Sequence, residues 1–209
     1  YSESDEERAP NYVVTPTGAR INRLFVTGVL TEVDAVNDGT NRGRVADPSG
    51  VFVTYAGQYQ PDEKAFLDRT EVPAFVALTG KARTYEPEDS DQVFTSVRPE
   101  SLNQVDADTR DRFVIAAAEA TLERIAIFTQ ALSSDYRGEA LQQALEAGGA
   151  PMSLAAGIPI AIEQYSTTTA YCEAIRQLAV DALAMIAGER DSVRVPEIAP
   201  GSGGDVPIG

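Results

Sequence analysis

The sequence predicts an α+β fold in which a small five-stranded β-barrel is followed by a C-terminal helical region. Two observations favour this fold. Residues 19–105 contain short runs of alternating apolar and polar residues separated by turn residues, which is typical of strands. Residues 106–188 instead repeat apolar residues at spacings of three and four, which is the period of an α-helix. The 209 residues, of which 43% are apolar, are enough for one barrel and an appended helical region.

The first expected strand is the longest and covers residues 21–36. Gly28 lies in its middle, and a glycine inside so long a strand usually marks a bend in a curved barrel. An Asn-Asp-Gly-Thr turn at residues 37–40 then reverses the chain. The later strands are expected at residues 42–46, 51–56, 74–81 and 92–97, with a short helix that begins at a proline at residues 61–69.

Five short strands with a helix between the third and the fourth are the element order of an OB-fold barrel. A small open sheet with the same elements is the alternative. Phe25, Phe52 and Phe75 alternate as residues of a barrel core would. If Phe52 faces the core, Thr54 shares its face and Tyr55 points outward, because side chains alternate along a strand.

Three helices are expected in residues 106–188, which we interpret as a helical assembly region. Asp108 can cap a long helix of about 25 residues, in which apolar residues recur at helical spacing. The other two are expected at residues 138–147 and 169–187, on either side of a Gly-Gly-Ala-Pro break. Residues 1–18 are expected to form an acidic N-terminal arm, and the proline- and glycine-rich residues 189–209 a flexible tail.

The charge of the chain is strongly unbalanced. Against 32 Asp and Glu there are 17 Lys and Arg, so that the net charge is -15, and only Lys64 and Lys81 are lysines. This composition is typical of a halophilic protein, because in molar salt the Debye length falls to about 3 Å and repulsion between carboxylates is screened. An acidic protein from an ordinary-salt environment is the alternative.

Composition also excludes several classes of chemistry. The chain has no histidine, which excludes a Ser-His-Asp triad, a Cys-His pair and an imidazole metal ligand. Its single cysteine, Cys172, excludes an internal disulfide and favours a reducing cytoplasm. No apolar run approaches the ~20 residues of a membrane span. We therefore expect no enzymatic activity, no cofactor, no metal and no membrane contact, with a hydrolase that uses Asp and Glu as the remaining enzymatic alternative.

Basic and aromatic residues are interleaved on the expected strands. Single-stranded nucleic acid needs such a surface, because cations meet its phosphates and flat rings stack on its bases for ~1–3 kcal/mol each. The alternative is that tyrosines are simply common in strands. The candidate nucleic-acid-binding residues are Arg42, Arg44, Tyr55, Tyr59, Lys81, Arg83, Tyr85 and Arg98.

Several segments carry a resemblance to a known family. The barrel segments are LFVTGVL at residues 24–30, RVADPSGVFVTYAG at 44–57 and FVALTGKAR at 75–83, and they resemble an OB-fold subunit of replication protein A (RPA). The continuation is TSVRPESL at 95–102, DADTRDRF at 106–113 and AEATLERI at 118–125. It resembles the haloarchaeal RPA-associated proteins, which are similar to the middle subunit of the RPA trimer.

The resemblance covers roughly residues 19–132 and implies a subunit of a complex that binds single-stranded DNA in replication, repair and recombination. It implies that Tyr55 and Tyr85 occupy the positions of DNA-contacting rings, with Arg83 beside Tyr85. It also implies a hetero-oligomer in which the helix after the barrel assembles with other RPA subunits. The candidate interface residues are Ile115, Leu122, Ile125, Phe128 and Leu132. A structural or regulatory subunit that holds other proteins without touching DNA is the alternative, favoured by the negative net charge.

Overall fold

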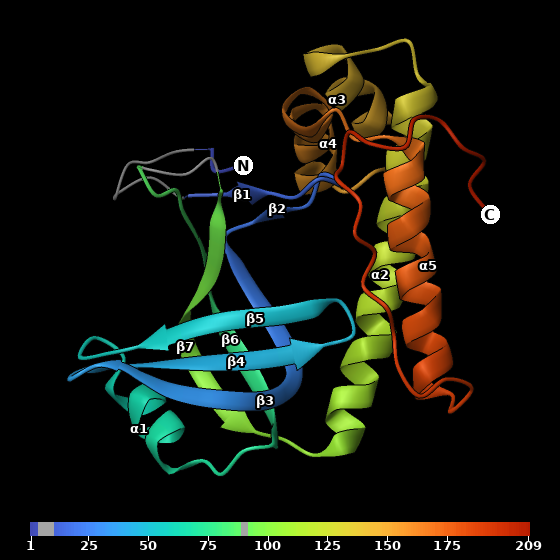
Figure 1. The fold of residues 1–209 in the computed structure, drawn as a ribbon. Coiled ribbons are helices and arrows are strands. Elements are labelled where there is room, and N and C mark those ends of the chain that lie inside the picture. The colour runs from blue at the N-terminus through green and yellow to red at the C-terminus, as the bar shows by residue number, and fades with distance from the viewer. Residues whose placement is uncertain (4–10, 89–91) are drawn as a thin grey trace. The chain divides into compact units, whose positions relative to one another are not determined.

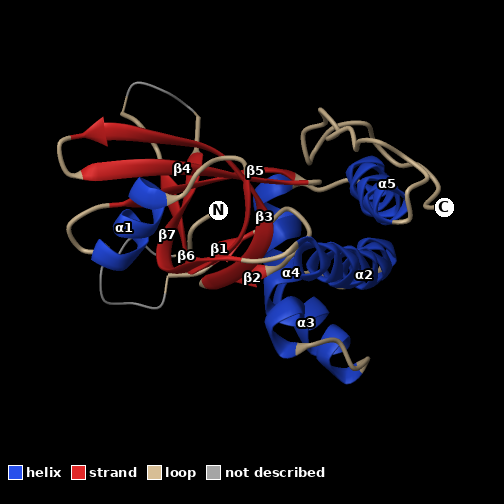
Figure 2. Cartoon of the chain, turned by 90° about the horizontal axis from the view of Figure 1, so that it is seen from below, coloured by secondary structure: helices blue, strands red, loops and turns tan. Residues whose placement is uncertain are grey.

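The chain folds into two compact units, one of which is inserted into the sequence of the other. The computed structural model describes residues 1–3, 11–88 and 92–209 (Figure 1). Residues Asn22–Ile115 form the barrel unit, and Tyr1–Ile21 together with Ala116–Gly209 form the helical unit. Figure 2 shows the secondary structure of both units. The chain therefore begins the helical unit, builds the whole barrel, and then returns to complete the helical unit.

The barrel unit is a closed sheet of five strands. The strands are β3 (Arg23–Asn37), β4 (Thr40–Asp47), β5 (Gly50–Ala56), β6 (Ala74–Tyr85) and β7 (Phe94–Gln104), in the order β3-β4-β5-β7-β6. All neighbours are antiparallel except β5 and β7, which pair in parallel at Thr54 and Val97. Helix α1 (Pro61–Arg69) lies between the third and the fourth barrel strands. This is the predicted OB-type barrel followed by helices, and its closure excludes the open sheet.

The bend expected at Gly28 is a point of close backbone approach. A Cβ atom on Gly28 would lie 2.4 Å from the carbonyl oxygen of Ala46 on β4, so only glycine fits there. This close approach lets β3 pair with β4 along one part of its length and with β6 along another. The core that the closed sheet encloses is formed by Val26, Leu30, Val45, Ala56, Phe66, Leu67, Val76, Leu78, Val97 and Leu102.

Two of the three phenylalanines expected in this core lie outside it. Phe52 packs against the core, as predicted. Phe25 is 52% exposed and packs edge to face against Phe113, with ring centroids 5.5 Å apart. Phe75 lies beneath the Arg110 guanidinium, 5.0 Å from the ring centroid. The inward positions of β3 and β6 are occupied by neighbouring valines and leucines, so Phe25 and Phe75 face outward.

The helical unit contains one helix that the sequence pattern did not predict. Its helices are α2 (Ala107–Ser133, whose first turns belong to the barrel unit), α3 (Gly138–Ala147), α4 (Met152–Tyr165) and α5 (Thr169–Ile186). Helices α2, α3 and α5 confirm the predicted ones, whereas α4 falls in a stretch left without an element. Its core consists of Val14, Ile125, Phe128, Ala131, Leu141, Leu154, Ile158, Ala161 and Cys172.

Both ends of the described chain contribute to the helical unit. Of the expected acidic arm, residues 4–10 lie outside the described residues, but β1 (Val13–Val14) pairs with β2 (Arg20–Ile21), and Val14 is fully buried. The expected flexible tail has no helix or strand, yet its Pro200 and Gly204 carbonyls accept hydrogen bonds from Thr168 and Ala170 at the start of α5. The tail therefore lies against α5.

Candidate nucleic-acid interface

Tyr55 points outward from the barrel, as the alternation of β5 predicts. Thr54 and Ala56 are fully buried on the inner side, whereas Tyr55 is 41% exposed. Directly opposite Tyr55 on the neighbouring strand β4 is Arg42. A ring and a guanidinium thus lie side by side on the outer face of the β4–β5 hairpin.

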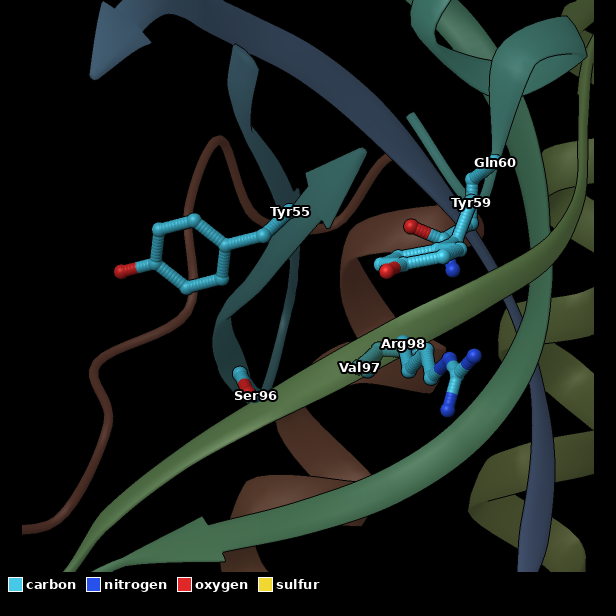
Figure 3. A pocket seen from close by; sticks show the side chains of 6 residues that line it. All are labelled: Tyr55, Tyr59, Gln60, Ser96, Val97 and Arg98. Carbon is cyan, nitrogen blue, oxygen red and sulfur yellow. The ribbon is translucent and has the colours of Figure 1, made fainter. Parts of the chain in front are cut away.

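Tyr55 also borders an open pocket of about 410 Å³ between β5, the segment before α1, and β7. Figure 3 shows the side chains that line it: Tyr55, Tyr59, Gln60, Ser96, Val97 and Arg98. Strands β5 and β7 meet at this pocket, where the Thr54 hydroxyl donates a 2.9 Å hydrogen bond to the Val97 carbonyl. Tyr59 is 78% exposed. Three of the predicted residues, Tyr55, Tyr59 and Arg98, are therefore brought together by the fold.

The β6–β7 pair carries Lys81, Arg83, Tyr85 and Arg98 of the predicted residues, whereas Arg44 lies on β4 beside Arg42. In its register, Lys81 is opposite Arg98, Arg83 is opposite Ser96, and Tyr85 is opposite Phe94. Tyr85 is 66% and Phe94 is 53% exposed. Since Ser96 and Arg98 also line the pocket, the surface from Arg42 across Tyr55 to Tyr85 is connected through neighbouring strands.

The cations of this surface fall into two groups. Arg42 donates to Asp34 at 2.5 Å, and Arg44 lies 3.4 Å from Glu32, so both pair with carboxylates of β3. The hydrogen bond from Arg42 lowers the pKa of Asp34, although burial opposes it. In contrast, no carboxylate among the described residues lies within ion-pair distance of the other group, which is Lys81, Arg83 and Arg98.

Lys81 and Arg98 belong to a lateral row of three cations. Arg23 on β3 is opposite Lys81, which is opposite Arg98. The carboxylate of Glu100 lies at this row and accepts a 2.7 Å hydrogen bond from Arg23. This hydrogen bond lowers the pKa of Glu100, and the charges of Lys81 and Arg98 make smaller contributions in the same direction. Like charges directly opposite each other in a sheet are unfavourable. An anion bound at Lys81 and Arg98 would relieve their repulsion.

Sequence reasoning missed the acidic members of this surface. Glu32, Asp34 and Glu100 were not predicted because the sequence contains 32 acidic residues, and Arg23 was not among the predicted cations. The signal that could have found them is strand register, because each lies opposite or next to a predicted cation.

The predicted interface residues of α2 are divided between surface and core. Ile115 is 37% exposed, and Leu122 and Leu132 are half-buried. Ile125 and Phe128 are 2% and 0% exposed, because β1, α3, α4 and α5 contribute to the core that encloses them. These two are therefore core residues of this chain and offer no free surface. A subunit interface on α2 stays a prediction for Ile115, Leu122 and Leu132.

The acidic side chains, the single cysteine and the helices were the subject of the other sequence expectations. Within residues 1–3, 11–88 and 92–209, no group of three or more acidic or cysteine side chains could hold a metal ion. Cys172 is fully buried, and burial raises the pKa of its thiol to about 11. None of the described helices is long and apolar enough to span a membrane.

Comparison with known proteins gives likenesses of structure alone. No protein-family model and no curated protein matches the sequence. A chain of a Replication Protein A heterotrimer bound to ssDNA is 14% identical, with 59% of this chain and 88% of that chain covered and a TM-score of 0.42.

Two other solved structures are similar to a smaller part of the chain. For the S. pombe Stn1–Ten1 complex the identity is 18%, the coverage 45% of this chain and 66% of that chain, and the TM-score 0.37. For the mitochondrial single-stranded DNA binding protein of S. cerevisiae the identity is 13%, the coverage 41% of this chain and 94% of that chain, and the TM-score 0.34. All three TM-scores lie below 0.5.

Proposed function

We propose that this chain binds single-stranded DNA on the outer surface of its barrel unit. The observation that carries the proposal is the combination, on connected strands, of exposed rings with cations that have no carboxylate partner among the described residues. The rings are Tyr55, Tyr59, Tyr85 and Phe94, and the cations are Lys81, Arg83 and Arg98.

The two kinds of residue have different tasks in this proposal. Each exposed ring offers a flat apolar face to an unpaired base, which every base can use whatever its sequence. The cations neutralise phosphates and release the ions condensed on them, so their contribution falls as salt rises. In a chain with a net charge of -15, stacking carries the larger share of affinity at high salt.

The sequence resemblance to RPA subunits suggests in which kind of complex the chain acts. We propose that the chain is a subunit of an RPA-type hetero-oligomeric complex that acts in replication, repair and recombination, in the cytoplasm of a halophilic archaeon. The part of α2 that carries Ile115, Leu122 and Leu132 would contact the other subunits. The half-buried apolar side chains there support this assignment.

A second candidate function is favoured by the ion pairs of the β4 arginines. Because Arg42 and Arg44 are already paired with Asp34 and Glu32, two of the predicted phosphate contacts are occupied within the chain. A structural or regulatory subunit that holds other proteins, while partner chains contact DNA, would have this arrangement.

Binding of labelled oligonucleotides tests the proposal. The experiment measures fluorescence anisotropy of an oligothymidine of about 16 nucleotides, the upper site size of one OB fold. The purified chain is titrated into it and into a duplex of equal length, between about 0.1 and 1 M KCl. We expect saturable binding that prefers the single strand at each salt concentration. No binding of the single strand by the chain alone would overturn the proposal in favour of the second candidate.

A further inference from the structure

We propose that Asp34 and Glu32 compete with the phosphates of bound DNA for Arg42 and Arg44. They hold Arg42 and Arg44 in an electrically neutral network, and the arginines exchange these carboxylates for phosphates when DNA binds. The inference rests on the proposed function, and it concerns how affinity at that site responds to salt.

The network follows from the register of three neighbouring strands. Figure 1 shows β4 between β3 and β5. Across these strands Asp34 is opposite Arg42, which is opposite Tyr55. Two residues along, Glu32 is opposite Arg44 in the same way. Each arginine therefore has a carboxylate on its β3 side, and Arg42 also has a ring on its β5 side.

The contacts hold the arginines but leave them open to exchange. Arg42 donates through Nη2 to Asp34, whereas its buried Nε has no hydrogen-bond partner, so the carboxylate satisfies the guanidinium only in part. The side chains of this pair are 35% and 37% exposed, and those of Arg44 and Glu32 are 38% and 50% exposed. Ion pairs with this much exposure are weak, so a phosphate from solvent can replace the carboxylate.

The salt dependence of DNA binding distinguishes an arginine that exchanges a carboxylate for a phosphate from a cation that has no carboxylate partner to leave. A cation that neutralises a phosphate of single-stranded DNA lowers the slope of log K against log salt by about 0.7. When Arg42 instead leaves Asp34 for the phosphate, the freed carboxylate attracts a cation from solution, which offsets the ion released from DNA. Arg42 and Arg44 then add contacts without adding salt dependence, in contrast to Lys81, Arg83 and Arg98.

The test compares Asp34→Asn with Asp38→Asn. Asp38 is an exposed residue of the β3–β4 turn, and no ion pair joins it to any of the described residues. Both variants remove one negative charge from the same hairpin. We expect Asp34→Asn to bind oligothymidine about two- to fivefold more tightly at low salt and to steepen the salt slope by about 0.7. Asp38→Asn should leave the slope unchanged.

Two further variants make the outcome decisive. Glu32→Gln should steepen the slope in the same direction, and in an Arg42→Ala background Asp34→Asn should lose its effect. Thermal melts establish that each variant is folded. Equal behaviour of Asp34→Asn and Asp38→Asn, or an effect that persists without Arg42, overturns this inference while wild-type binding stands. Absence of binding by every variant and by the wild type overturns the proposed function, and the inference with it.

Discussion

Arg42 and Tyr55 are directly opposite each other on β4 and β5, with both side chains on the outer face of the barrel. The pairing places a guanidinium within one strand spacing, about 5 Å, of an aromatic ring. Tyr55 in turn borders the pocket that contains Arg98. One ring therefore lies between two cations, of which Arg42 is paired and Arg98 is not paired among the described residues.

Replacing Tyr55 by alanine should weaken binding of oligothymidine by ~1–3 kcal/mol without changing the salt slope, because the loss is one of stacking. Anisotropy titrations at several salt concentrations measure both quantities. Tyr136→Ala is the matched control, since Tyr136 is a 57% exposed tyrosine of the helical unit. If Tyr55→Ala binds as the wild type does and is folded, Tyr55 is not a stacking residue.

Arg83→Ala should instead reduce the steepness of the salt dependence by about 0.7, because it removes one phosphate contact. Its affinity should approach that of the wild type as salt rises. Arg112→Ala serves as control, since Arg112 is an exposed arginine of α2 and is not among the predicted binding residues. A slope that stays at the wild-type value would remove Arg83 from the site.

Ile125→Asp should destabilise the helical unit by more than about 3 kcal/mol, because it places an unpaired charge in a core position that is 2% exposed. Ile115→Asp, at a position that is 37% exposed, should melt like the wild type and test the proposed subunit interface. Chemical unfolding followed by circular dichroism measures the first effect, and co-purification with partner subunits the second. A stable Ile125→Asp variant would contradict the observed core.

The net charge of -15 predicts that salt stabilises the fold. Carboxylates repel one another less when the Debye length shrinks, so the unfolding midpoint should rise between dilute buffer and ~1 M KCl. A gain of about 1–3 kcal/mol corresponds to about 2–12 °C for a chain of this size. Calorimetry measures the shift, and an unchanged or lower midpoint would contradict the halophilic interpretation.

Cys172 should report opening of the helical unit. Its thiol is fully buried with a pKa of about 11, so at pH 8 it is neither accessible nor ionised. Labelling by a thiol reagent should therefore be slow in the native chain and rapid in denaturant. Because this is the only cysteine, the signal needs no further substitution. Rapid labelling of the native chain would show that this core is open.

The barrel was predictable because its strands are short, alternating and separated by recognisable turns. Which charged residues of β3 and β4 lie opposite each other was not predictable, because the register of these strands shifts close to the turn. Counted from the turn, where Asn37 pairs with Thr40, a regular hairpin would place Asp34 opposite Gly43. A register shift between Ala35 and Asn37 moves Asp34 to Arg42. Bulges of this kind depend on the closure of the whole sheet and leave little trace in sequence.

Helix α4 was missed for a different reason. It contains Gly157 and Pro159, which both lower helix propensity, and its residues are apolar on nearly every side. The structure explains the glycine: a Cβ on Gly157 would lie 2.0 Å from the carbonyl oxygen of Gly18. The helix exists because the turn between β1 and β2 packs against it, a contact between segments far apart in sequence.

Because of this contact, the helical unit cannot be completed until the C-terminal part of the chain has been synthesised. The Tyr165 hydroxyl donates to the Val14 carbonyl, and Thr167 donates to the Pro16 carbonyl, each across 151 residues of chain. At a translation rate of about 5–20 residues per second, Tyr165 and Thr167 are synthesised roughly 8 to 30 s after Val14 and Pro16. The entire barrel unit is synthesised within that interval and can close first. During translation, the barrel unit can therefore be folded while β1 (Val13–Val14) and Pro16 still lack their contacts with α4 and with the segment that follows α4.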